Sequence, residues 1–289
     1  MHVFVTGATG WVGSAVVADL LAAGHRVTGL ARSEQKAAAL AASGAQVVRA
    51  SLDDHPALHE AAGAADAVIH TAFDHDFSRF ADNAAQDQRV IEVLGSALMG
   101  SNRLLLVTSG LSGLPRGGTE TDGPAPVSPR RSEAAAISLA ERGLRAATVR
   151  LAPSVHGIGE THGFVPMLIR KARETGVSAY LADGRNRWSG VHRLDAARLF
   201  RLALEHGVTA SVYHAVAEEA LPFLDIATAI GQRLGLPVEP REREHFGWFA
   251  AMAGAEMSAS SARTRALLGW HPTGPGLLAD LEHPGYGAG

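Results

Sequence analysis

Glycines near the N-terminus are the residues whose spacing most directly implies chemistry. An apolar stretch, Val3 to Val5, runs into TGATGWVG at Thr6 to Gly13 and then into apolar residues at helical spacing. The unpaired N–H groups of a helix N-terminus bind anions, and glycine lets a pyrophosphate approach the backbone. The pattern predicts a strand, a turn and a helix that hold a dinucleotide, in preference to a turn that only links two elements. The expected contacts are Thr6, Gly7, Thr9, Gly10, Trp11, Val12 and Gly13.

The end of the second predicted strand, residues 25–30, indicates which dinucleotide is bound. An acidic residue there usually binds the ribose 2′-hydroxyl of NAD, whereas an arginine suits the 2′-phosphate of NADP. The sequence has Arg32, Ser33 and Lys36 at this point, and Glu34 is expected in the first turn of the next helix. We therefore expect NADP(H) as the cofactor. The alternative is that Arg32 and Lys36 are solvated charges at a helix start.

Further candidate residues follow the third and fourth predicted strands. Asp53 comes after the strand 46–49, where it could accept a hydrogen bond from an adenine amino group or cap the next helix. The strand 67–70 leads through small residues into Ala72 and Phe73. Ligands of open α/β sheets bind outside the carboxyl ends of the strands, so a cofactor could lie close over this point.

The last two strands of the first half also end in polar residues. The strand 103–107 leads to Ser109, whose hydroxyl could bind a substrate oxygen, although a Ser-Gly turn residue is the plain alternative. The loop 111–129 is rich in Gly, Pro and Ser and is expected to be irregular. The strand 146–151 then leads into the turn from Pro153 to Gly157.

Six repeats of a strand followed by a helix occupy the first half of the chain. This alternation predicts an α/β fold with a Rossmann-type doubly wound parallel sheet. Beyond Gly157 the regular alternation of strand and helix ends. We therefore expect a nucleotide-binding domain, 1–157, and a smaller α+β substrate domain, 158–289. Residues 191–217 are expected to pack back on the first domain. The predicted elements of the second part are helix 164–175, strand 177–181, loop 183–188, helix 195–206, strand 211–216 and helix 222–234.

Composition narrows the class of protein. The 289 residues are 46% hydrophobic and 19% charged, which is ordinary for a globular protein. The absence of cysteine excludes disulfides and cysteine-ligated metal, so we expect no metal and a reducing, cytoplasmic location. A net charge of −3 without a basic run argues against nucleic acid or a membrane as partner. The expected partner is a small-molecule substrate.

Five motifs together resemble the extended short-chain dehydrogenase/reductase superfamily, and within it the atypical, epimerase/dehydratase-like members. They are TGATGWVG at 6–13, VIHTA at 68–72, LLLVTSG at 104–110, VRLAPSVHG at 149–157 and GRNRWSGVHRLDAARL at 184–199. The resemblance covers most of the chain. It implies a Rossmann domain that holds NAD(P), a C-terminal domain that holds the substrate, and a homodimer formed through the helices at 82–98 and 132–142.

The catalytic pair of that superfamily is missing. There, a tyrosine gives a proton to the substrate carbonyl, and a lysine four residues later lowers the pKa of the tyrosine and holds the ribose. The aligned positions are Pro129 and Glu133, whereas the superfamily's serine is retained as Ser109. Hydride transfer to a carbonyl builds an alkoxide that needs a proton or a cluster of donors, so this chain must supply them differently.

Three solutions to the missing proton donor are open. Another side chain could donate, and the candidates are His156, His192, Tyr180 and His162. A water oriented by Ser109 could donate instead. The substrate could also be an imine or iminium, on which no oxyanion forms.

Each of these histidines and the nearby aromatic residues also has an ordinary interpretation. His156 could replace an aromatic residue that packs under the nicotinamide. Phe164, Trp188, Phe246 and Trp248 are expected mainly to pack, although Trp188 lies in a loop that we expect to face the pocket.

The sequence as a whole favours an NADPH-dependent reductase of a carbonyl or C=N group in a small organic molecule. Ala72, Pro153 and Val155 would face the nicotinamide, and Ser109 would orient the reacting atom. A non-catalytic NADP(H)-binding sensor is the alternative, because it would explain the missing pair directly. A sugar-nucleotide epimerase is a weaker third hypothesis, since such enzymes need the tyrosine and usually hold NAD.

Overall fold

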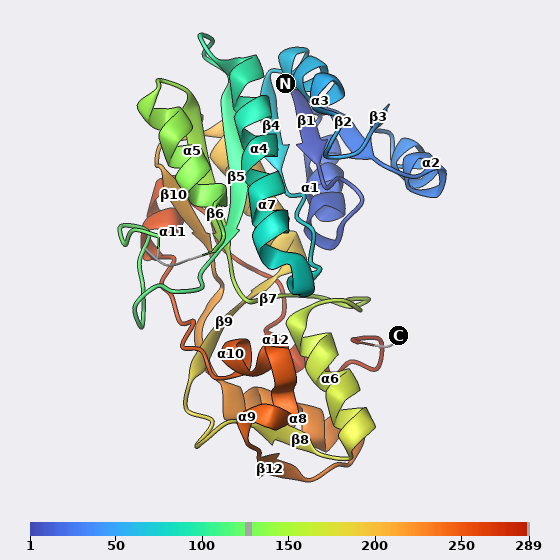
Figure 1. Ribbon diagram of the computed structural model, residues 1–289, viewed down its shortest axis with the longest axis vertical. Coiled ribbons are helices and arrows are strands. Elements are labelled where there is room, and N and C mark those ends of the chain that lie inside the picture. The colour runs from blue at the N-terminus through green and yellow to red at the C-terminus, as the bar shows by residue number, and fades with distance from the viewer. Residues whose placement is uncertain (125–128, 288–289) are drawn as a thin grey trace.

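The computed structural model describes residues 1–124 and 129–287, and its larger part is a parallel sheet between two layers of helices (Figure 1). Seven strands pair in the order β10-β6-β5-β4-β1-β2-β3, all of them parallel. This is the strand order of a doubly wound Rossmann fold, extended by β10, which confirms the predicted fold class. The strands are β1 His2–Thr6, β2 Arg26–Ala31, β3 Gln46–Arg49, β4 Ala67–His70, β5 Leu104–Gly110, β6 Arg145–Leu151 and β10 Val212–Ala215.

Helices cover both faces of this sheet because its strands are apolar on both sides. Along β1, Val3 and Val5 pack into one buried cluster, whereas Phe4 packs into the other. The first face is covered by α1 Trp11–Ala22, α2 Glu34–Ala42 and α7 Arg193–Glu205. The second face is covered by α3 His55–Gly63, α4 Phe80–Leu98 and α5 Ser132–Glu141.

A smaller body lies beyond the carboxyl ends of the sheet strands (Figure 1). It contains a three-stranded sheet in the order β11-β9-β7 and a two-stranded sheet of β12 and β8. Its strands are β7 Ser154–His156, β8 Ser178–Tyr180, β9 Arg187–His192, β11 Glu218–Pro222 and β12 Val238–Pro240. Its helices are α6 Phe164–Thr175, α8 Phe223–Leu234, α9 Arg243–Phe246, η2 Gly247–Phe249, α10 Ala250–Ala253 and α12 Leu277–Glu282. The helix α11, Ala262–Leu268, packs instead against β10 and α7.

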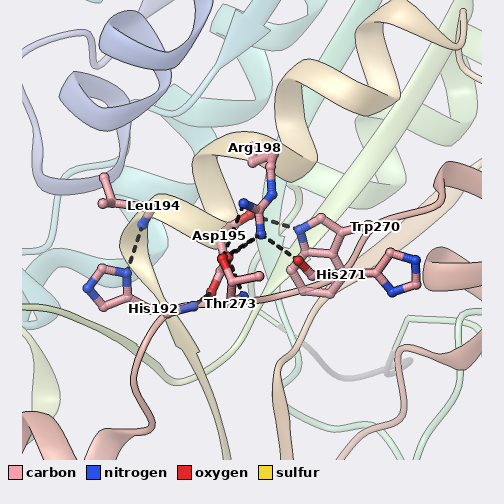
Figure 2. Close-up of polar contacts among 8 residues, drawn as sticks. His192, Leu194, Asp195, Arg198, Trp270, His271 and Thr273 are labelled. Atoms are coloured by element: carbon pink, nitrogen blue, oxygen red, sulfur yellow. Dashed lines mark hydrogen bonds and ion pairs between the residues drawn. The ribbon is translucent and has the colours of Figure 1, made fainter.

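The chain crosses between the two bodies several times, and one buried carboxylate holds such a crossing in place. Asp195, in the first turn of α7, accepts hydrogen bonds from the backbone N–H groups of Thr273 at 3.0 Å and Gly274 at 2.7 Å (Figure 2). Arg198 pairs with the same carboxylate, and the Trp270 indole donates to the Asp195 carbonyl at 3.0 Å. Asp195 therefore fixes the C-terminal segment against the start of α7.

Several elements differ from the predictions, and each difference comes from pairing between distant segments. The strand β5 continues to Gly110, so Ser109 lies within it, because β6 pairs with it along that length. The predicted loop 183–188 overlaps β9, and Trp188 is fully buried there, so the expectation that it faces a pocket is wrong. The strands β7 and β11 were not predicted. The described part of the loop 111–129 is irregular, as predicted, and residues 125–128 lie outside the described residues.

Candidate active site

The glycine-rich turn between β1 and α1 fits closely against the end of β4. Gly7 has φ +68°, and a Cβ there would lie 2.6 Å from the Ala72 nitrogen and 2.7 Å from the Thr71 hydroxyl. A Cβ on Gly13 would lie 2.1 Å from the Gly7 carbonyl oxygen. Gly7 and Gly13 are therefore required for the turn itself, because a side chain at either position would separate the turn from the sheet.

Within the glycine-rich segment between β1 and α1, the first turn of α1 is the part that suits a phosphate group. Its N-cap is Gly10, which has no side chain to satisfy the first amides, and no acidic residue lies in its first turn. The amides of Trp11, Val12 and Gly13 therefore offer uncapped donors at the positive end of the helix. Thr9 is half-buried beside them. The residues present thus fit the pyrophosphate of a dinucleotide.

Two residues of the glycine-rich turn that were expected to contact the cofactor have side chains that contact the protein instead. The Thr6 hydroxyl is buried and hydrogen-bonds His70 Nδ1 at 2.7 Å, so its side chain faces the protein interior and not a cofactor. The Trp11 indole donates to the Val155 carbonyl at 2.7 Å, and the Arg193 guanidinium lies 3.9 Å from its ring centre. Trp11 thereby ties the start of α1 to β7 in the smaller body. Pro153 and Val155 remain partly exposed at this junction.

The carboxyl end of β2 carries the three residues expected at a 2′-phosphate. Arg32, Ser33 and Lys36 are all exposed there. Ser33 is the N-cap of α2, and its hydroxyl accepts a hydrogen bond from the Lys36 amide at 3.4 Å. Glu34 lies in the first turn of α2, as predicted, and pairs with Arg49 of β3. The carboxylate of Glu34, which follows this strand end, is thus paired with Arg49.

One of the two roles considered for Asp53 is wrong. The N-cap of α3 is the next residue, Asp54, whose carboxylate accepts from the Ala57 amide at 3.2 Å. The Asp53 carboxylate instead accepts a hydrogen bond from the Gln86 side chain at 2.6 Å. An adenine contact for Asp53 stays a prediction.

Of the two positions that align with the catalytic pair, the lysine position is buried in the protein core and the tyrosine position is exposed. Glu133, at the lysine position, forms a buried two-point ion pair with Arg150, with N–O distances of 2.8 and 2.6 Å. Arg150 also donates to the Asp122 carbonyl at 2.7 Å. Pro129, at the tyrosine position, is exposed. Neither residue can supply the chemistry of the tyrosine and lysine.

Arg130, which the sequence analysis missed, lies at the edge of β5 next to the expected site. Its guanidinium donates to the Thr108 carbonyl at 3.1 Å and to the Ser132 hydroxyl at 3.0 Å. Its central carbon also lies 4.2 Å from the ring centre of Phe73. Burial lowers the pKa of Arg130, and the charge of Asp87 opposes this shift. A partly desolvated cation therefore sits beside Thr108, the residue that precedes Ser109.

A buried chain of hydrogen bonds positions Ser132 and, through it, Arg130. His70 at the end of β4 binds Asp87 of α4 at 2.9 Å, and the other oxygen of Asp87 accepts from the Ser132 hydroxyl at 2.5 Å. All three side chains are buried. Because every member contacts the next, the chain links the end of β1, through Thr6, to the arginine at the site.

His156 is buried in the smaller body, and its contacts argue against the chemical role expected for it. Its Nδ1 lies 2.6 Å from Asp280, and its Nε2 lies 3.5 Å from Glu218. Burial lowers the pKa of His156, but the contacts with Glu218 and Asp280 outweigh burial, so the pKa is raised. The imidazolium is therefore fully buried between two carboxylates, although its Nε2 has only the ion-pair contact with Glu218 and no hydrogen bond.

The other proton donors considered from the sequence lie in different places. His192 is half-buried at the N-cap of α7, and its ring is 5.7 Å from that of His156. Burial and the charge of His156 lower the pKa of His192, although Asp280 opposes them. His162 is paired with the neighbouring Thr161 hydroxyl at 2.6 Å. Tyr180 lies in β8, at the end of the smaller body that is distant from the large sheet (Figure 1).

The loop after β4 places a second histidine near the candidate site. His75 contacts the Phe73 ring edge-to-face at 5.5 Å. Desolvation and the charge of Arg130 lower its pKa, while the Phe73 backbone and Asp74 oppose the shift. A serine, an arginine and an exposed imidazole thus lie on the segments that follow the carboxyl ends of β4 and β5 or end β5 itself. The sequence offered one signal for Arg130, namely that this basic residue directly follows Pro129, the position aligned with the catalytic tyrosine.

Comparison with known proteins agrees with this fold. The model of the NAD dependent epimerase/dehydratase family matches residues 3–216, and the chain belongs to that family. An uncharacterized protein of Schizosaccharomyces pombe is 45% identical over 295 residues, which cover 99% of this chain and 100% of that protein. A 4-hydroxy-2-methyl-3-oxo-4-farnesyl-3,4-dihydroquinoline-1-oxide ketoreductase of Stigmatella aurantiaca is 26% identical over 256 residues, covering 83% of this chain and 75% of the ketoreductase.

Solved structures share the fold at low sequence identity. A UDP-glucose-4-epimerase from Stenotrophomonas maltophila superposes with a TM-score of 0.77 at 18% identity, covering 98% of this chain and 96% of the epimerase. The chain thus has the NAD(P)-binding, oxidoreductase-like fold of its family. Within residues 1–124 and 129–287, no helix is long and apolar enough to cross a membrane. The same residues hold no cluster of three or more His, Asp or Glu suited to a metal.

Proposed function

We propose that the protein is an NADPH-dependent reductase of a carbonyl group in a small organic molecule. The observation that carries this proposal is the position of Arg130, hydrogen-bonded to Thr108 beside Ser109 at the carboxyl edge of β5. A cation and a hydroxyl at that edge can stabilise the negative charge that develops on a carbonyl oxygen.

The cofactor would be held by groups that the described fold leaves open to a ligand. The uncapped amides of Trp11 to Gly13 would bind the pyrophosphate, and Arg32, Ser33 and Lys36 would bind the 2′-phosphate. Ala72, Pro153 and Val155 are proposed to lie beside the nicotinamide, as the sequence suggested. When bound, the reduced nicotinamide supplies a hydride.

Arg130 favours one of the two substrate types that the sequence left open. An alkoxide that forms beside a guanidinium is stabilised by its charge, whereas an iminium cation in the same place would be repelled. A ketone or aldehyde is therefore favoured over an imine. Arginine holds its proton too tightly to give it up, so the alkoxide would take its proton from water oriented by Ser109.

The relatives support a reductase in a limited way. The Stigmatella protein is named as a ketoreductase of a quinoline oxide, and it is similar over most of this chain. A sterol-4-alpha-carboxylate 3-dehydrogenase of Dictyostelium discoideum is 39% identical over 71 residues, which cover 25% of this chain and 22% of that enzyme. Both names describe chemistry at a carbon that carries an oxygen.

Two measurements on the purified protein test the proposal. The affinities for NADPH and NADH are measured by cofactor fluorescence, and NADPH oxidation is then followed with matched panels of ketones and cyclic imines. We expect tighter binding of NADPH and turnover of ketones above imines. Tight NADPH binding without turnover of any ketone would overturn the proposal in favour of a cofactor-binding sensor.

A further inference from the structure

Aromatic side chains from both bodies of the protein contact one another next to the loop that follows β4. The loop after β4 and the start of α4 contribute Phe73, Phe77 and Phe80, and the smaller body contributes Phe164 and Trp248. The closest contact joins the two bodies: the rings of Phe77 and Trp248 are stacked, with centres 4.9 Å apart and planes 21° from parallel. Phe77 also contacts Phe164 at 5.9 Å.

These rings form a continuous series that begins at Arg130. The guanidinium lies 4.2 Å from the Phe73 ring centre, and Phe73 contacts Phe80 at 5.6 Å. Phe80 then contacts Phe77 at 5.9 Å, which leads to Trp248. One surface therefore has a charged, hydrogen-bonding end beside Ser109 and an aromatic end between the two bodies.

The outer end of this series is exposed, unlike the aromatic core beneath it. Trp248 is 58% exposed, although it is one of the largest apolar side chains in the protein. Phe249 and Trp188, which lie below it, are buried and contact each other at 6.1 Å. The stack of Phe77 on Trp248 lies at the surface, and a planar ligand that separates the two rings would replace their mutual contact, worth about 0.5–1.5 kcal/mol, by two contacts of its own.

Charges around the aromatic loop disfavour an anionic ligand. Asp74 and Asp76 are exposed on the loop that carries Phe73 and Phe77. Hydrogen bonds from Ser78 lower the pKa of Asp76, so this carboxylate is ionised at neutral pH. Arg79 also acts on Asp76, so the segment carries both signs of charge, but the two exposed carboxylates disfavour an anion beside Phe77, whereas an uncharged aromatic compound is not affected.

We infer that the substrate is an uncharged ketone or aldehyde attached to a flat aromatic ring system, with its oxygen toward Arg130 and its rings between Phe77 and Trp248. This inference rests on the proposed function, because it uses the same site. Planar rings stack on aromatic side chains with an energy that a saturated ring of similar size does not gain. The aromatic end therefore selects the substrate, and the arginine end prepares it for reaction.

The test uses two ketones with the same carbon skeleton, 2-acetylnaphthalene and the corresponding acetyldecalin, and compares the ratio of their kcat/KM values between variants, because conjugation with the ring also changes the intrinsic reactivity of the carbonyl. For the wild type we expect kcat/KM to be about tenfold higher for the aromatic ketone, as loss of one or two ring contacts implies. Phe77→Leu and Trp248→Leu should each lower kcat/KM for the aromatic ketone more than for acetyldecalin, which removes most of this preference. Leu267→Ala, an exposed substitution on α11, is the control and should retain the preference.

A binding measurement separates this inference from the proposed function. With NADP⁺ present, 2-acetylnaphthalene should quench the part of the fluorescence that Trp248→Phe removes, and acetyldecalin should not. Equal quenching, or equal loss of both activities in the two leucine variants, would overturn the inference. If the aromatic ketone quenches Trp248 but neither ketone is reduced, the aromatic site stands and the reductase proposal fails.

Discussion

Two buried histidine–carboxylate pairs lie at the ends of strands in this protein, and they serve different purposes. His70 pairs with Asp87 at 2.9 Å in the part with the seven-stranded sheet, and His156 pairs with Asp280 at 2.6 Å in the smaller body. The carboxylate of the first pair continues through Ser132 toward Arg130, which faces the candidate site. In the second pair the other ring nitrogen, Nε2, lies 3.5 Å from Glu218 without a hydrogen bond, and because the ring is fully buried we call this cluster closed.

The difference teaches that a histidine at a strand end is informative only through its partners. A polar cluster that is buried and faces only other protein groups contributes to folding and offers nothing to a ligand. A cluster that ends on a charged group at the surface of a cleft can instead contribute to chemistry. Substitutions in the closed cluster should change stability, and substitutions at the open end should change kinetics.

The largest effect is expected from Asp280→Ala, which breaks the closed pair. The variant leaves a protonated His156 without its nearest counter-charge in the protein interior. Removing one partner of a buried ion pair costs about 3–5 kcal/mol of the free energy of unfolding. Urea denaturation at pH 6 measures this loss. The double variant His156→Leu with Asp280→Leu should recover much of it, and a loss below about 1 kcal/mol in Asp280→Ala would contradict the assignment.

Arg130→Met should affect catalysis to a similar degree and stability much less. If the guanidinium stabilises the developing alkoxide, its removal lowers kcat by about 10²–10³-fold, as for other oxyanion-stabilising donors. Steady-state kinetics with a ketone and NADPH, together with NADPH affinity, would measure this effect. Arg131→Met is the matched control, because Arg131 is exposed on the neighbouring position and contacts Gln88. Similar kinetics in both variants would refute the role of Arg130.

A third prediction concerns a buried acid of the smaller body. Glu160 accepts a hydrogen bond from the Tyr286 hydroxyl at 2.6 Å, and burial raises the pKa of Glu160 from 4.5 to about 7. The unfolded chain ionises near 4.5, so stability from this group is lost as the pH rises from about 4.5 to 7, by about 3 kcal/mol in total. Glu160→Gln should therefore be more stable relative to the wild type at pH 8 than at pH 5.

Thermal unfolding at both pH values measures that difference, and Glu205→Gln provides a control of opposite sign. Desolvation tends to raise the pKa of Glu205, but its bonds to His25 and Arg201 outweigh it and lower the pKa. Loss of this carboxylate should therefore destabilise the protein more at pH 8 than at acidic pH. If Glu160→Gln showed the same pH dependence as Glu205→Gln, Glu160 would not be held protonated in the fold.

The open and closed clusters also show how much the sequence could tell. The parallel sheet and the glycine turn follow from apolar periodicity and short-range spacing, which act within a few residues. The burial of His156 against a carboxylate could not be predicted, because its partner Asp280 lies 124 residues later in the chain. Arg130 was missed because its meaning depends on contacts with Phe73 and Thr108, which only the folded sheet brings together.

The smallest effect is expected at a third place that is open to a ligand, the carboxyl end of β2. Arg32 is exposed there, so Arg32→Asp should leave the free energy of unfolding within about 0.5 kcal/mol of the wild type. A charge-assisted bond to a 2′-phosphate contributes about 1.5–3 kcal/mol, and a carboxylate at that place would repel the phosphate. The variant should therefore bind NADPH about 10- to 100-fold more weakly and prefer NADH.

Arg26→Asp is the matched control for this prediction, because Arg26 is exposed at the opposite, amino end of the same strand. Both variants change the net charge equally, so a general electrostatic effect on an anionic cofactor would weaken binding in both. A specific contact would weaken NADPH binding only in Arg32→Asp, with little change for NADH. Unchanged NADPH affinity in Arg32→Asp would remove the argument for NADP(H), while the reductase proposal would still depend on Arg130.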